Sequence, residues 1–198
     1  MARGPAKSGL RVPAYTLAMP EKGPKSLVAL VVTATVSMLV ACQVGSEAEQ
    51  LTDAQKKERL EALYQGYQKS FPTIDSISVE EFLELQQGTK QVVLVDVREP
   101  KEREVSMIPG AIDAATFKRE AQQYRDAVVV PYCTAGYRSG FFTQELQEAG
   151  WDVRNLEGSI LAWTLAGLPL ENAEGPTRKV HVYGRTWDLA AGDFSAVW

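Results

Sequence analysis

The chain has 198 residues and a mass of 21.8 kDa, which suffices for one domain with appended segments. Hydrophobic residues make up 45% and charged residues 23%, a globular composition, and the formal net charge is -4. An acidic chain without a basic stretch is a poor partner for nucleic acid, because phosphate contacts supply most of that affinity. One histidine, His181, and two cysteines, Cys42 and Cys133, are too few for a zinc site, and we expect no metal and no cofactor.

Residues 1–41 are typical of a targeting segment. The run 27–41 carries no charge, follows two lysines, and is shorter than the roughly 20 residues that a membrane-spanning helix needs. It ends on Leu-Val-Ala followed by Cys42, which resembles the bacterial lipobox. We therefore expect lipidation at Cys42 and an exported protein, anchored to a membrane and facing the periplasm.

The start of this segment leaves alternatives open. Residues 1–18 make the basic region before the apolar run unusually long, so Met19 is an alternative start of translation. An uncleaved signal-anchor is one further alternative. An organellar membrane protein is another, because residues 1–18 are basic, contain no acidic residue and weakly resemble a transit peptide.

Residues 42–72 are predicted to form a tether and a helix. Thr52 can cap the helix, and an apolar stripe follows at helical spacing, made of Leu60, Leu63, Tyr64 and Tyr67. Pro72 ends the pattern. The stripe indicates packing against the chain's own domain, with docking on a partner as the alternative.

Predicted helices and strands alternate over residues 73–171. The strands are expected at 92–97, 111–116, 127–133 and 152–158, and the helices at 78–88, 117–126, 139–150 and 159–167. The runs at 92–97 and 127–133 are apolar and β-branched, as in strands buried on both faces. This order predicts an α/β domain with a mainly parallel central sheet flanked by helices. Residues 172–198 are predicted to be a C-terminal extension, a hairpin or extended segment that covers the domain.

Cys133 lies where a buried strand ends and a helix follows. Ligands of open α/β sheets bind beyond the carboxyl ends of the strands. Unpaired backbone N–H groups and the dipole of the helix stabilise a thiolate there. Gly136 lets the loop turn tightly, and Arg138 adds a positive charge. The pattern predicts a nucleophilic thiolate beside an anion site, and the alternative is an inert buried cysteine.

Four motifs, in order, resemble a rhodanese-like domain. They are LVDVREPKE (94–102), IPGAI (108–112), YCTAGYRS (132–139) and LEGSILAWTLAGLPL (156–170). The resemblance covers about residues 76–171 and implies a rhodanese-like α/β fold and sulfur transfer. In this chemistry Cys133 takes a sulfane sulfur from a donor such as thiosulfate or a persulfide. It then passes the sulfur to a thiol or to cyanide.

The resemblance also implies roles for other residues. The persulfide on Cys133 would be cradled by the loop residues Thr134, Ala135, Gly136, Tyr137, Arg138 and Ser139. Arg138 would help to bind an anionic donor, and Asp96 and Arg98 would support the fold and the edge of the pocket. Thr134 stands where the family often has arginine, which weakens thiosulfate binding. Ser106-Met107 replaces the family's frequent Gly-His at a position that we expect to be structural.

Two other functions stay open. One is a non-catalytic rhodanese-like module that binds a partner or senses oxidants. The other is a phosphatase, which the spacing C-x4-R disfavours, because related phosphatases use C-x5-R to accommodate phosphate. The acidic cluster of Asp96, Glu99, Glu102 and Glu104 is expected to form a solvated face, with Glu102 and Arg103 on a surface helix. His181 is expected to be structural or exposed.

Overall fold

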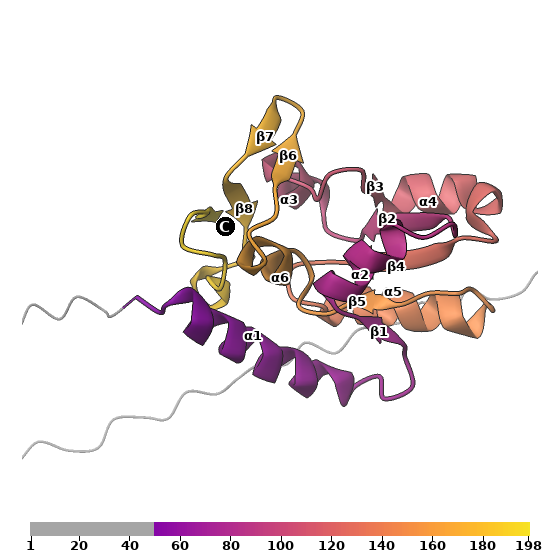
Figure 1. The fold of residues 1–198 in the computed structure, drawn as a ribbon, viewed down its shortest axis with the longest axis horizontal. Coiled ribbons are helices and arrows are strands. Elements are labelled where there is room, and N and C mark those ends of the chain that lie inside the picture. The colour runs from indigo at the N-terminus through magenta and orange to yellow at the C-terminus, as the bar shows by residue number, and fades with distance from the viewer. Residues whose placement is uncertain (1–49) are drawn as a thin grey trace, which may run out of the picture. The chain divides into compact units, whose positions relative to one another are not determined.

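The structure is a computed structural model that describes residues 50–198 (Figure 1). The predictions for the apolar run at 27–41 and for Cys42 lie outside the described residues. Among residues 50–198, no helix is long and apolar enough to cross a membrane.

A three-stranded parallel sheet forms the centre of the fold, in the order β3-β2-β4. Strand β2 (Val92–Asp96) pairs with β4 (Val128–Tyr132) from Val92 opposite Val128 to Asp96 opposite Tyr132, and with the short β3 (Ile112–Asp113) on its other side. A second parallel pair joins β1 (Ser76–Ile77) to β5 (Asn155–Leu156), and a bridge from Val129 to Val153 leads from β4 towards it. All five residues of β4 are buried, as the apolar run predicted.

Alternate residues of the central strands serve two apolar clusters. Leu94 and Val130 belong to one, which includes side chains of α2 (Val79–Gln86) and α6 (Ser159–Leu165). Val93, Val95 and Val129 belong to the other, with side chains of α4 (Ala114–Glu120) and α5 (Tyr137–Glu148). Since neighbouring side chains of a strand point to opposite faces, the sheet is covered on both faces by helices.

Several elements are shorter than the sequence predicts. Strand β3 has two residues, because its last residue, Asp113, also caps α4 by accepting hydrogen bonds from the amides of Ala115 and Thr116. Helix α4 then passes into the 3-10 helix η1 (Ala121–Tyr124). The short helix α3 (Pro100–Val105) follows β2 and carries part of the acidic cluster towards the interior.

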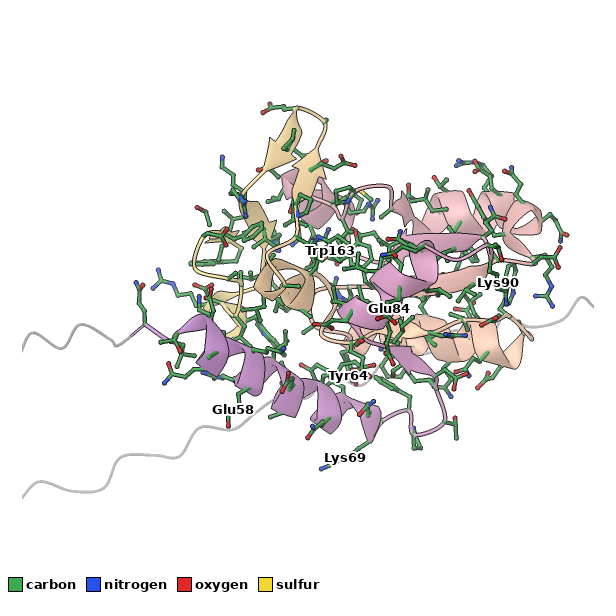
Figure 2. All side chains as sticks on the ribbon, viewed as in Figure 1. Glu58, Tyr64, Lys69, Glu84, Lys90 and Trp163 are labelled. Carbon is green, nitrogen blue, oxygen red and sulfur yellow. The ribbon has the colours of Figure 1, made fainter. Side chains whose placement is uncertain are left out.

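Helix α1 (Asp53–Gln68) packs on the domain. Thr52 and Gln55 form a capping box at its start, and Leu60 and Tyr64 are buried against the domain, where α1 contacts α5 and α6. Figure 2 shows Tyr64 on the side of α1 that faces the domain, with Glu58 and Lys69 on the outer side. The apolar stripe therefore docks on its own chain, as expected.

The C-terminal residues belong to the core as well as covering it. Strands β6 (Leu170–Asn172) and β7 (Gly175–Thr177) form an antiparallel hairpin. Strands β8 (Lys179–His181) and β9 (Ser195–Val197) form a parallel pair across η2 (Arg185–Trp187). Val180, Val182 and Leu189 are buried in the same cluster as the central sheet. The backbone N–H of Gly192 donates to Asp53 at 2.8 Å, which places the C-terminal segment beside the start of α1 (Figure 1).

Candidate active site

The sulfur of Cys133 lies in the loop between β4 and α5. Its Sγ accepts a hydrogen bond from the backbone N–H of Gly136 at 3.2 Å and one from the Ser139 hydroxyl at 3.6 Å. Its own backbone N–H donates to Ser159 Oγ at 3.0 Å, which ties the loop to the start of α6. Only 2% of Cys133 is exposed. The loop thus encloses the sulfur almost completely.

The surroundings of the thiol favour its charged form. Burial alone raises the pKa of Cys133, but it is outweighed by hydrogen bonds from Ser139, by the charge of Arg138 and by the amide of Gly136. The pKa therefore lies below its ordinary value of 9.0. The loop thus stabilises the thiolate of Cys133, which is the form of the side chain that acts as a nucleophile.

The contribution of Ser139 can be tested directly. We expect Ser139→Ala to raise the pKa of the Cys133 thiol, because the thiolate loses a hydrogen-bond donor. The thiolate is then lost at a higher pH as the solution is acidified, and its fraction at neutral pH falls. Thiolate absorbance in the ultraviolet, followed against pH, measures this. Ser106→Ala is the matched control, because the buried Ser106 hydroxyl has no hydrogen-bond partner among the described residues. An unchanged titration of Ser139→Ala would contradict the assignment.

Arg138 is bound by a buried carboxylate. Its two terminal nitrogens donate to the two oxygens of Glu102 at 2.6 and 2.7 Å, a bidentate pair, and Thr134 Oγ1 donates to the same carboxylate at 3.2 Å. Burial raises the pKa of Glu102, but the hydrogen bonds and charge of Arg138 dominate and hold it at about 2. Glu102 is therefore ionised at neutral pH, and it neutralises the charge of Arg138.

The expected solvated face is wrong for Asp96, which is buried in an ion pair with Arg98, and it is wrong for Glu102. Its side chain is 1% exposed, whereas Glu99 and Glu104 of the same acidic cluster are exposed. Helix α3 turns Glu102 towards the loop, where Arg138 compensates its charge. A buried carboxylate is stable only with such a partner, and nothing in the local sequence identifies one that lies 36 residues away. Arg103 is half-buried and donates to the carbonyl oxygen of Arg98.

Asp96 and Arg98 form a buried ion pair that supports the fold. The guanidinium of Arg98 contacts Asp96 Oδ2 at 2.7 Å and the carbonyl oxygen of Ser106 at 2.6 Å, and it lies over the ring of Tyr132. These contacts fasten the end of β2 to the segment that follows α3. Ser106 is buried, as a structural role for that position requires. Neither Asp96 nor Arg98 makes a hydrogen bond to residues 134–139.

The loop rests on α1 through a small polar network. Asn155 Nδ2 donates to the carbonyl oxygen of Gly136 at 2.9 Å and to the Tyr64 hydroxyl at 3.1 Å. Ser76 Oγ lies 2.8 Å from the same hydroxyl. The motifs did not identify Asn155 or Tyr64 as site residues. The helical stripe contained Tyr64, but spacing alone does not show what a helix face will contact.

Five aromatic side chains from α1, α5 and the segments near them pack against one another, and we call them the aromatic rim. The rim consists of Tyr67 and Phe71 from α1 and the turn that follows it, Tyr137 and Phe141 from α5, and Trp187 from η2. The ring of Tyr137 lies 5.0 Å from that of Tyr67 and 5.1 Å from that of Phe141, between centroids. Burial and the charge of Cys133 raise the pKa of Tyr67 to about 12, so the phenol is neutral at neutral pH.

His181 lies near Glu102, the carboxylate that pairs with Arg138, and carries no charge at neutral pH. Its Nδ1 accepts a hydrogen bond from the backbone N–H of Tyr183 at 3.1 Å, and burial lowers its pKa. The same nitrogen is 4.0 Å from Glu102. Within residues 50–198, no cluster of three His, Cys, Asp or Glu side chains is arranged to hold a metal ion.

Comparisons with known proteins match the central part of the chain. The model of the rhodanese-like domain family matches residues 78–166. A sulfurtransferase from Allochromatium vinosum is 38% identical over 106 residues, which is 52% of this chain and 96% of that protein. An HTH-type transcriptional regulator from Mycobacterium tuberculosis is 34% identical over 49% of this chain, but the match spans only 45% of the regulator.

Solved structures are similar as well. The thiosulfate sulfurtransferase from Pseudomonas aeruginosa is 29% identical, with a TM-score of 0.48, over 57% of this chain and 23% of that chain. The Allochromatium relative, in contrast, is matched over nearly its full length. The chain belongs to the rhodanese-like domain family and has its α/β fold, a parallel sheet flanked by helices.

Proposed function

We propose that the protein is a rhodanese-type sulfurtransferase that carries a sulfane sulfur on Cys133. The observation that carries the proposal is the Cys133 sulfur, whose pKa is lowered and which accepts hydrogen bonds from Gly136 and Ser139. These groups stabilise a negative charge on sulfur without a histidine base. The similarity to a sulfurtransferase supports the same chemistry.

The reaction is a double displacement. The Cys133 thiolate attacks the sulfane sulfur of the donor, a new S–S bond forms, and the donor's remainder leaves with the electron pair of the broken bond. Cys133 then holds a persulfide. An acceptor thiolate or cyanide attacks the outer sulfur of the persulfide and releases the Cys133 thiolate, so no external oxidant or reductant is consumed.

The enclosed loop favours a sulfur cargo over phosphate. Both terminal nitrogens of Arg138 bind Glu102, so the charge of Arg138 is already compensated in part and attracts a phosphate dianion less strongly. The sulfur of Cys133 is almost completely buried, and the amide of Gly136 already points at it. A single added sulfur atom needs less space than a tetrahedral phosphate.

The test is the mass of the protein after treatment with a donor alone. Purified protein is incubated with thiosulfate and, separately, with an organic persulfide, and its intact mass is measured before any acceptor is added. A gain of one sulfur atom, lost again on addition of cyanide with release of thiocyanate, is the expected result. No adduct and no thiocyanate from a folded protein would refute sulfur transfer. A Cys133 sulfenic acid trapped after peroxide would then favour redox sensing.

The site of action is a separate proposal, based on residues outside the described part of the chain. We infer that Cys42 is lipidated and that the protein is exported and held at a membrane, because the charge-free run 27–41 ends on Leu-Val-Ala-Cys. Incorporation of a labelled fatty acid into the protein is expected in a bacterial host, and Cys42→Ser is expected to abolish it. Labelling that persists in Cys42→Ser would contradict the proposal.

A further inference from the structure

We propose that Glu102 sets the donor preference of this site: it disfavours the thiosulfate dianion and leaves organic sulfane donors that carry at most one charge, such as organic persulfides, as the preferred substrates. The inference rests on the proposed sulfur transfer at Cys133. It assigns a specificity-determining role to a residue that contacts the loop arginine.

The charges around the sulfur carry the first part of the argument. Arg138 lowers the pKa of Cys133 and is therefore the cation that a donor meets at the thiol. Its two terminal nitrogens both bind Glu102, and the pair is neutral. Arg98 is paired with Asp96, and His181 is neutral. Among the described residues, Glu102 thus offsets part of the attraction that Arg138 exerts on an anion, and the Cys133 thiolate repels a second anion in proportion to that anion's charge.

The geometry holds Glu102 in this role. Besides Arg138, its carboxylate accepts hydrogen bonds from Thr134 Oγ1 and from the backbone N–H of Glu99, and its side chain is 1% exposed. Thr134 stands next to Cys133 and contributes a hydroxyl to this carboxylate rather than a charge to the donor. A carboxylate with so many donors cannot turn away to release Arg138 without losing several hydrogen bonds at once.

The aromatic rim carries the second part. Tyr137, which lies four residues after Cys133, is 42% exposed and Phe141 is 48% exposed, and the ring of Tyr67 contacts those of Tyr137 and Trp187. Thiosulfate presents only hydrated oxygens beyond its sulfane sulfur, so it gains nothing from such a surface. An alkyl or aryl group on the donor would lose water against these rings.

The chemistry of such a donor balances within the site. The Cys133 thiolate attacks the terminal sulfur of R–S–SH, the new S–S bond forms, and the donor's S–S bond breaks. The thiolate R–S⁻ leaves with the electron pair, and the proton stays on the transferred sulfur. A leaving group with one negative charge is released more easily beside a neutral ion pair than sulfite, which carries two.

Three donors separate charge from shape. Thiosulfate, methanethiosulfonate and benzenethiosulfonate each carry a terminal sulfane sulfur, but the first has two charges and the others one, and only the last has a ring. The rate of persulfide formation on the full chain is measured for each donor by intact mass. Ratios between donors are compared across variants, so that the intrinsic reactivity of each donor cancels.

In Glu102→Gln, we expect the rate ratio of methanethiosulfonate to thiosulfate to fall about tenfold, because Arg138 regains its uncompensated charge. Glu104→Gln is the control, since Glu104 is exposed on the same helix and makes no ion pair among the described residues. Tyr137→Ala is expected to lower the ratio of benzenethiosulfonate to methanethiosulfonate and to leave the first ratio unchanged. If Glu102→Gln lowered the rate of persulfide formation equally for all three donors, Glu102 would only hold the loop in position and would not select the donor. That result would overturn the proposal.

Salt dependence tests the charge argument in the unsubstituted protein. We expect the thiosulfate rate to rise with ionic strength, because salt screens a repulsion, and the rates of the singly charged donors to change less. A thiosulfate rate that falls with salt would show net attraction and overturn the proposal even if Glu102→Gln did not fold. Absence of a mass gain with every donor would instead refute the proposed sulfur transfer itself.

Discussion

Cys133→Ser is expected to lower the rate of sulfur transfer at least about 10³-fold and to abolish the mass gain from every donor. A serine hydroxyl is protonated at neutral pH, so the hydrogen bonds from Gly136 and Ser139 that favour a thiolate have no charge to stabilise. Thiocyanate release and intact mass, measured on the same samples, give the result.

The fold of this variant should survive, because serine has nearly the shape of cysteine and its hydroxyl can accept the hydrogen bond from the Gly136 amide. Thermal unfolding of Cys133→Ser beside the unsubstituted protein checks this. Sulfur transfer that persists in a folded Cys133→Ser would locate the chemistry elsewhere. The chain's other cysteine, Cys42, would then be tested in the same way.

Sequence patterns predict the sheet well because burial on both faces leaves a strong signal. Strands β2 and β4 can be predicted from their own residues alone, because a short run of apolar, β-branched residues is typical of a strand that helices cover on both faces. Cys133 at the end of β4 follows from the same pattern. The lengths of β3 and β5 do not, because Asp113 can continue a strand or cap a helix, and tertiary packing decides between these.

The ion pair of Glu102 with Arg138 and the aromatic rim could not be predicted from the sequence. The local sequence of Glu102 is typical of an exposed charge. Its partner Arg138 is brought to it only because the loop and α3 contact each other in the folded chain. The rim joins Tyr67, Tyr137 and Trp187, which lie in three separate segments. Tyr67 and Trp187 lie outside the residues that match the family model, so the features proposed to select the donor come partly from flanking segments.

Gly136→Ala is the second change with a large expected effect. Gly136 adopts φ of +104°, which L residues with side chains rarely adopt, and a Cβ there would lie 2.5 Å from a ring carbon of Tyr64. Tyr64 is buried on the face of α1 that contacts the domain, and its hydroxyl is held by hydrogen bonds with Ser76 and Asn155, so the ring cannot move aside easily. We expect the backbone strain and the overpacking to cost about 2–5 kcal/mol of unfolding free energy, measured by denaturant unfolding.

The same substitution should also slow persulfide formation, because a displaced loop weakens the hydrogen bond from the Gly136 amide to Cys133. Gly66→Ala is the matched control. Gly66 lies in α1, and a Cβ added there has no atom of another part of the protein within 4 Å. We expect this variant to be slightly more stable than the unsubstituted protein, because alanine favours a helix more than glycine does. The two causes separate in a Tyr64→Ala background, where the overpacking disappears and the backbone strain stays. Gly136→Ala should therefore cost less stability there. An equal cost in both backgrounds would mean that the contact with α1 contributes nothing and that backbone strain alone requires the glycine.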